Sequence, residues 1–222
     1  MNKAQEERKY FDLIKDKAEK GDAESQYAMG LFCLYDQEKP DNHKEAEKWL
    51  RLAAEQGHCE AQFSLGELYL FGQEAEINCK EAIFWLKQSA ATGNPTHQLR
   101  LGYAYFSDGD YYEAEKWIRS SAEQGERDAQ VSLGTMYLHG MGVIKDEEKA
   151  IKWFKMAAKQ GDKRAQFEVR KFNRRKAGLP EETEGYKNVT PSISRAESES
   201  ISSKAIELQK FFEENGITLN YE

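Results

Sequence analysis

Residues 130–165, QVSLGTMYLHGMGVIKDEEKAIKWFKMAAKQGDKRA, hold one complete copy of a pattern that recurs along the chain. The copy opens with Gln130 and Gly134 and closes with Trp153 and Gly161. The same Gln-x3-Gly element begins at Gln26, Gln62 and Gln98, and a fifth copy begins at Gln166 with Arg170 in place of the glycine. The glutamines are 36, 36, 32 and 36 residues apart. A period in this range indicates an array of structural repeats.

The second half of every copy keeps one register around a tryptophan. An alanine lies three residues before it, small residues lie four and five after it, and a glycine lies eight after it. The tryptophans are Trp49, Trp85, Trp117 and Trp153, and the glycines are Gly57, Gly93, Gly125 and Gly161. Apolar residues at i, i+3, i+4 and i+7 are typical of an amphipathic helix, and a glycine directly after it suits a left-handed C′ position. Each unit is therefore predicted to be two helices joined by a loop, with the Gln-x3-Gly element on the first.

Four glycines fall inside the predicted first helices, at Gly30, Gly66, Gly102 and Gly134. A glycine within a helix costs up to about 1 kcal/mol relative to alanine. We expect this cost to be offset by close approach of the second helix, to which the tryptophan contributes a large apolar surface. The repeated glycine, alanine and tryptophan positions are therefore interpreted as packing positions.

The register predicts an all-α fold, an array of helix pairs with a separate C-terminal helix. The predicted segments are a capping helix at 1–21, repeats at 22–57, 58–93, 94–125 and 126–161, a capping half-repeat at 162–176, a flexible linker at 177–194 and an amphipathic tail helix at 195–222. In the capping helix, Leu13 stands at the tryptophan position. A terminal repeat tolerates such departures from the pattern, because its outer face contacts water rather than another repeat. The short third repeat loses four residues in its loop, where Ser107-Asp108-Gly109-Asp110 is a strong turn sequence.

Composition excludes several classes of function. The chain has 222 residues, 32 basic against 39 acidic, and a net charge of −7, which disfavours nucleic acid as the main ligand. No apolar run approaches the ~20 residues of a membrane span, and residues 1–7 show no secretory signal. Cys33, Cys59 and Cys79 are odd in number and do not recur between repeats, so we expect reduced thiols in a cytoplasmic protein.

No catalytic constellation is visible in the sequence. The four histidines, His43, His58, His97 and His139, fall in different repeats without the spacing of metal ligands. The loop pair Gly140 and Gly142 follows no predicted strand, which argues against a phosphate cradle. The chain is therefore predicted to be non-enzymatic, with no catalytic, cofactor-binding or metal site.

At this level of detail the pattern resembles a known family. The run Leu133-Gly134-x2-Tyr137-x2-Gly140-x-Gly142-Val143-x2-Asp146-x2-Lys149-Ala150-x2-Trp153-Phe154-x2-Ala157-Ala158-x2-Gly161-x3-Ala165 looks like a complete Sel1-like repeat. The first two copies lack the Gly-x-Gly-Val element, and the third has the shorter loop of a tetratricopeptide unit. The resemblance covers roughly residues 8–172. It implies a right-handed α-solenoid of antiparallel helix pairs that works as a scaffold or peptide-binding adaptor, mostly in bacteria and also in eukaryotic quality-control complexes.

In such a solenoid the first helices line the concave face. Positions two before, one after and five after the repeat glycine should project into that groove, and they differ from copy to copy. The predicted partner-binding residues are Leu31, Tyr35, Glu67, Phe71, Arg100, Tyr103, Ser132, Thr135 and His139. Arg100 beside Tyr103 is the strongest predicted anchor pair, because arginine and tyrosine dominate interface energetics.

The sequence therefore predicts an adaptor that binds a peptide or protein in its concave groove. One alternative is an inhibitor or immunity protein, which would occlude a toxin or enzyme with its variable loops and acidic surface. A second alternative is a helical-repeat RNA binder, against which the net charge argues.

The C-terminal stretch carries a separate prediction. Ser194 and Glu197 form a capping-box pair, and an apolar stripe follows at Ile201, Ala205, Leu208 and Phe212. A single helix of this length is marginal in water, so we expect the stripe to dock on its own solenoid or on a second protein. The alternative is a helix that forms only transiently.

Overall fold

The computed structural model describes residues 3–35, 43–71 and 78–180, and this part of the chain contains ten α-helices and no strand. The helices are α1 (Lys3–Glu19), α2 (Ala23–Tyr35), α3 (His43–Glu55), α4 (Cys59–Phe71), α5 (Cys79–Ala90), α6 (Pro95–Asp108), α7 (Tyr111–Glu123), α8 (Arg127–His139), α9 (Glu147–Lys159) and α10 (Lys163–Lys176). The all-α prediction is confirmed. The predicted tail helix and its docking residues Ile201, Ala205, Leu208 and Phe212 lie outside the described residues.

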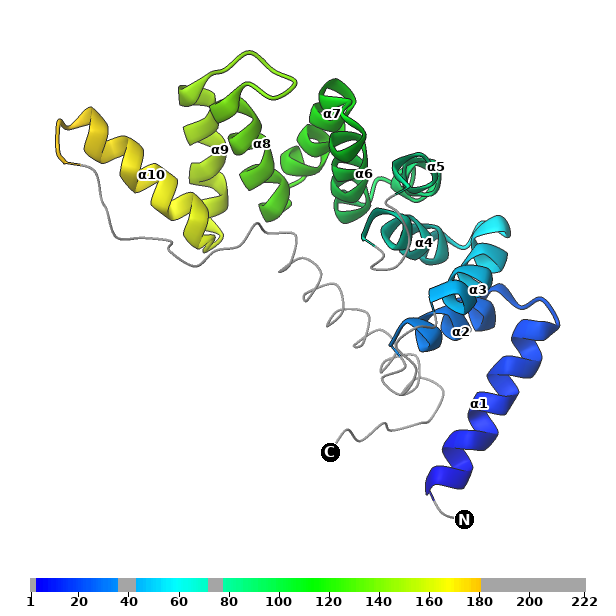
Figure 1. Ribbon diagram of the computed structural model, residues 1–222. Helices are drawn as coiled ribbons and strands as arrows, with labels where there is room; N and C mark the ends of the chain where they lie inside the picture. The colour runs from blue at the N-terminus through cyan, green and yellow to red at the C-terminus, as the bar shows by residue number, and fades with distance from the viewer. Residues whose placement is uncertain (1–2, 36–42, 72–77, 181–222) are drawn as a thin grey trace. The chain divides into compact units, whose positions relative to one another are not determined.

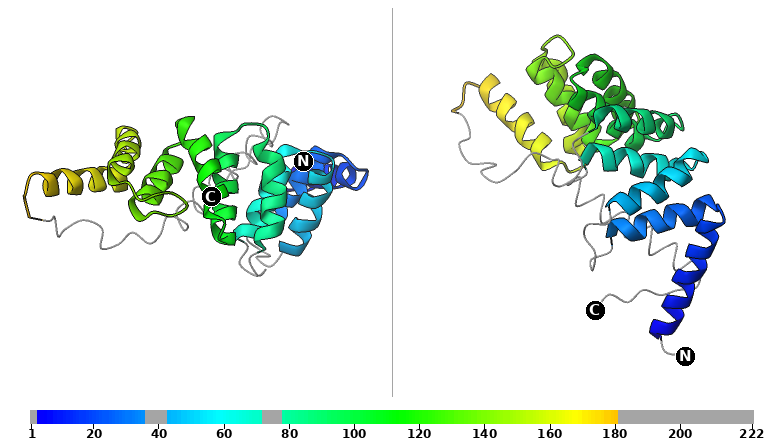
Figure 2. Two further views of the ribbon diagram at one scale, coloured as in Figure 1. Left: turned by 90° about the horizontal axis from the view of Figure 1, so that it is seen from above. Right: turned by 45° about the vertical axis from the view of Figure 1, so that its right-hand side comes forward.

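The described residues form two compact units, 3–65 and 66–180, with the boundary inside α4. In the first unit α1 packs against α2, and α2 against α3. In the second unit each helix from α5 to α10 packs against the next one in the chain (Figures 1 and 2). Short connections make these neighbours antiparallel, so both units are built from the helix pairs of an α-solenoid.

The glycines inside the first helices lie where the second helix comes closest. A methyl group at Gly66 would lie 2.5 Å from Leu86 Cγ, and one at Gly102 would lie 2.5 Å from Ile118 Cγ1. Carbon atoms do not approach this closely without displacement, so glycine is required here for the two helices to pack. The predicted close approach of the helices is confirmed.

The sequence predicts that the tryptophan faces each glycine. In the structure, the residue after the tryptophan faces it instead. These residues are Leu50, Leu86, Ile118 and Phe154. Successive residues on a helix are rotated by about 100°, so the tryptophan is turned away from the glycine. The capping helix follows the same rule, because Leu13 at the tryptophan position is 47% exposed whereas Ile14 is buried.

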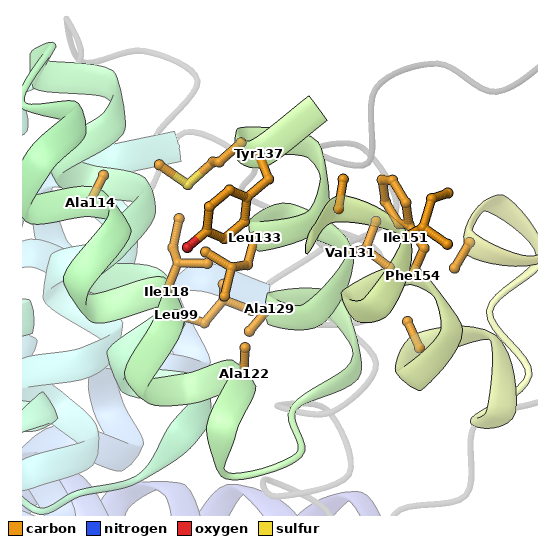
Figure 3. Close-up of a cluster of buried hydrophobic side chains, with 14 residues drawn as sticks. Leu99, Ala114, Ile118, Ala122, Ala129, Val131, Leu133, Tyr137, Ile151 and Phe154 are labelled. Carbon is orange, nitrogen blue, oxygen red and sulfur yellow. The ribbon is translucent and has the colours of Figure 1, made fainter. Parts of the chain in front are cut away.

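The core of the second unit lies between its helix pairs (Figure 3). Ile118, Leu133 and Phe154 are almost completely buried, and Leu99 and Val131 pack in the same cluster. Small residues such as Ala122 and Ala150 keep neighbouring helices close enough for these side chains to interlock. This regular core fixes the spacing of α6 and α8, which carry the variable positions discussed below.

The repeat glutamines join the end of one helix pair to the start of the next. Gln130 is buried, and its amide donates to the Ala122 carbonyl at 3.3 Å and accepts from Gln160 Nε2 at 3.0 Å. The same bond to a carbonyl eight residues earlier is made by Gln26, Gln62 and Gln166. Each of these carbonyls, near a helix C-terminus, also accepts a backbone N–H from the turn that follows, so the glutamine adds a second bond that ties this turn to the next helix.

Gln130→Ala is expected to lower the free energy of unfolding by about 1–3 kcal/mol, because it removes two hydrogen bonds at a buried position, each with a net contribution of about 0.5–1.5 kcal/mol. Chemical denaturation measures the loss. Gln166→Ala is the matched control: it removes the same type of bond, but at a half-buried position, so its effect should be smaller. Equal losses would contradict the role of burial.

Candidate protein-interaction face

The variable positions of α4, α6 and α8 contact one another across the second unit. Arg100 on α6 donates from Nε to Glu67 Oε1 on α4 at 2.9 Å, although the two residues are 33 positions apart. Their side chains are 11% and 9% exposed. The pair is therefore largely removed from water, where an ion pair with a direct hydrogen bond is stronger than at the surface.

A second contact continues from α6 to α8. The Tyr103 hydroxyl lies 2.9 Å from Ser132 Oγ, and either atom can be the donor. Burial raises the pKa of the Tyr103 hydroxyl above its usual value, while the bond to Ser132 and the charge of Arg100 act in the opposite direction. The hydroxyl is therefore neutral at physiological pH and available for this bond.

Both contacts follow one geometric rule. The residue two before the glycine of one repeat meets the residue one after the glycine of the preceding repeat. We call the variable positions on α4, α6 and α8 of the second unit the groove face. Its members are Glu67, Phe71, Arg100, Tyr103, Ser107, Ser132, Thr135 and His139. Four of them, predicted separately as ligand contacts, thus also link neighbouring repeats to one another.

The remaining predicted residues differ in exposure. His139, at the end of α8, is exposed, whereas Thr135 is half-buried and its hydroxyl donates to the Val131 carbonyl at 2.9 Å. Phe71 is half-buried beside Arg100. In the first unit Leu31 is only 2% exposed, and the side chain of Tyr35 is outside the described set. The accessible part of the prediction therefore lies on the groove face.

A second surface, which the residue predictions did not include, lies at the loops of the third and fourth repeats. We call it the loop edge and define it by Tyr111, Tyr112 and Ile144. Tyr112 and Ile144 are 63% and 91% exposed. Gly142 packs here so tightly that a methyl group on it would lie 2.2 Å from the Tyr111 carbonyl oxygen. The sequence feature that could have predicted this surface is the presence of large apolar residues close to the turn glycines Gly109 and Gly142.

Two of the histidines have structural partners within their own unit. His58 Nε2 lies 3.0 Å from Glu24 Oε2, and its ring packs on Tyr27 with centroids 4.7 Å apart. His97 is buried, and its Nδ1 lies 3.4 Å from the Ser89 carbonyl. His58 thus contacts α2 of the preceding helix pair, and His97 on α6 contacts α5. Both histidines therefore have a packing role.

The family model described as Sel1 repeat matches residues 23–58, 59–94, 98–126 and 127–162, more than half of the chain. The chain belongs to the Sel1 repeat family, whose solenoid is a scaffold fold for protein–protein interaction. No protein with a curated description matches it. None of the described helices is long and apolar enough to cross a membrane.

Solved structures show the same fold. The chain is similar to a protective antigen present in uropathogenic Escherichia coli strains, with 28% identity and a TM-score of 0.64 over 92% of this chain. It spans 44% of the length of that protein. A Sel1 repeat protein from Oxalobacter formigenes has 28% identity and a TM-score of 0.58, with 88% of this chain and 74% of that one covered. The MamA protein, 19% identical with a TM-score of 0.51 and coverages of 88% and 98%, shares the fold alone.

Proposed function

We propose that this chain is a non-enzymatic adaptor that binds a segment of a partner protein on the groove face. The observation that carries the proposal is the contrast between fixed and variable positions on the same helices. The glutamine and glycine of the first helix are the same in α4, α6 and α8, whereas the positions one and five after the glycine carry a different side chain in each. A constant frame with varied side chains is suited to recognising successive features of one extended ligand.

The links within the groove face support this role. Because Glu67 binds Arg100 and Tyr103 binds Ser132, these side chains are already ordered before a ligand arrives. Ordering an exposed side chain on binding costs about 0.5–1.5 kcal/mol, so a pre-ordered face loses less affinity. The exposed members Ser107 and His139 lie at the ends of α6 and α8, where a ligand can reach them without displacing the links.

The loop edge supports a second candidate, a protein that occludes a toxin or enzyme. Tyr112 and Ile144 are large apolar residues in contact with water, and aromatic residues are enriched at protein interfaces. A partner that covers this edge would contact loops rather than the groove face. The two candidates therefore predict different contact positions.

Site-specific photo-crosslinking in the native host separates them. A photoreactive phenylalanine is placed at His139 on the groove face, at Ile144 on the loop edge, or at Phe84, an exposed residue of α5. The adaptor proposal expects one protein adduct from position 139 and none from position 84. An adduct from position 144 alone would favour the occluding protein. Adducts of equal yield at all three positions would contradict both candidates.

A further inference from the structure

Arg100 is held from three sides. Its guanidinium carbon lies 5.8 Å from the ring centroids of both Phe71 and Tyr103, and its Nε donates to Glu67. Ring faces attract a guanidinium through their negative electrostatic potential. The position of the Arg100 side chain is therefore fixed by the two rings and by the bond from its Nε to Glu67.

The terminal nitrogens of this guanidinium make no hydrogen bond to the described residues. Within the part of the chain that the structure describes, the bond from Nε to Glu67 is the one hydrogen bond that Arg100 makes. Among the described residues, the buried side-chain polar atoms without a hydrogen-bond partner are His43 Nδ1, Ser64 Oγ and Trp85 Nε1, and the terminal nitrogens of Arg100 are not among them. About one-tenth of the side chain remains exposed, and its terminal N–H groups have the planar arrangement that binds an oxyanion through two parallel bonds.

The charges around Arg100 favour a carboxylate over a phosphate. Glu67 already neutralises part of the positive charge, and Asp128 and Glu126 are close enough to raise the pKa of the neighbouring Tyr103. A phosphate group carries up to two negative charges and would be repelled by these carboxylates more strongly than a singly charged group. A carboxylate also matches the width of the two-nitrogen edge.

We propose that Arg100 is the anchor of the groove face for an acidic side chain of the bound protein segment. The inference rests on the proposed function and narrows it from any peptide to one that carries an aspartate or glutamate. Glu67, Phe71 and Tyr103 act as positioning residues, because they hold the guanidinium while its terminal nitrogens contact the ligand.

The test is an NMR titration of the full chain, in which the arginine Nε–H signals are followed. The probes are acetyl-Ala-Glu-Ala-amide, its glutamine counterpart, and acetyl-Ala-Gln-Ala with a free C-terminal carboxylate. We expect saturable shifts at Arg100 with the glutamate probe, with a Kd on the order of 10 mM. The glutamine amide should bind at least about tenfold more weakly. Arg119 is the internal control, because its terminal nitrogen already donates to Glu115 and to Tyr137.

Arg100→Lys keeps the charge and its position beside Glu67 but removes the pair of parallel donors. It should weaken the binding of the glutamate probe about tenfold, while the circular dichroism spectrum of the protein stays unchanged. If the free-carboxylate probe bound as well as the glutamate probe, a carboxylate anchor would be supported but an acidic side chain as its source would be contradicted. Equal shifts with the glutamine amide, equal shifts at Arg119, or an unchanged affinity in Arg100→Lys would overturn the inference. If position 139 still gave its crosslink in that case, the adaptor function would be supported without Arg100 as its anchor.

Discussion

Gly66→Leu is expected to lower the free energy of unfolding by about 3 kcal/mol, the upper range for overpacking a core. The first added carbon would already lie 2.5 Å from Leu86 Cγ and 3.2 Å from the Leu86 backbone nitrogen. The backbone contact means that a rotamer change of Leu86 cannot relieve the clash, so α4 and α5 must separate. Thermal or urea unfolding of the full chain measures the effect.

A double-mutant cycle shows whether the loss comes from this contact. Leu86→Ala alone should cost about 2–5 kcal/mol by opening a cavity. Gly66→Ala combined with Leu86→Ala should cost less than the sum of the single changes, because the methyl group at position 66 enters the space that Leu86 vacates. Strict additivity would contradict the close-approach explanation. Ser107→Leu, on the exposed end of α6, is the control for adding the same side chain without a clash.

Removing one partner of the Glu67–Arg100 pair is expected to cost about 3 kcal/mol, because it leaves a charge without its partner at a site that is about one-tenth exposed. Glu67→Leu and Arg100→Ser, made singly, should each show this loss in urea denaturation. The double variant should lose less than either single variant, since no unpaired charge remains.

The chain itself supplies the reference for this double variant. The corresponding positions in the two preceding helices are Leu31 and Ser64, which are buried. An apolar and a small residue are therefore compatible with the same fold at these two positions. A double variant as unstable as the sum of the single ones would show that the ion pair is required for the repeat geometry.

The repeat register could be predicted from the sequence because packing restricts the same positions in every copy. Gly66 and Gly102 predicted the close approach of the helices, because a glycine within a helix lowers its stability unless close packing offsets that cost. The predicted facing residue was wrong by one position, since Trp85 and Leu86 are both apolar and both buried, and only the rotation of the helix decides which one contacts the glycine. A hydrophobic pattern defines a stripe wider than one residue, so it does not resolve this choice.

The groove face was predictable as a set of positions but not as a set of contacts. Neighbouring helices lie about 8–10 Å apart, a gap that Arg100 and Tyr103 can cross but that short side chains cannot. Arg100 and Glu67 thus form a pair, whereas Ser64 Oγ has no hydrogen-bond partner among the described residues. Whether a long side chain meets a neighbouring helix or a ligand depends on its rotamer, which the repeat pattern does not contain.

Hydrogen exchange of the full chain, with and without the partner recovered by crosslinking, tests the groove-face proposal most directly. The adaptor account predicts slower amide exchange at residues 100–107 of α6 and 132–139 of α8 in the complex, with little change in α7 and α9. Slower exchange confined to residues 109–112 and 140–146, with α6 and α8 unchanged, would place the partner on the loop edge and contradict the account.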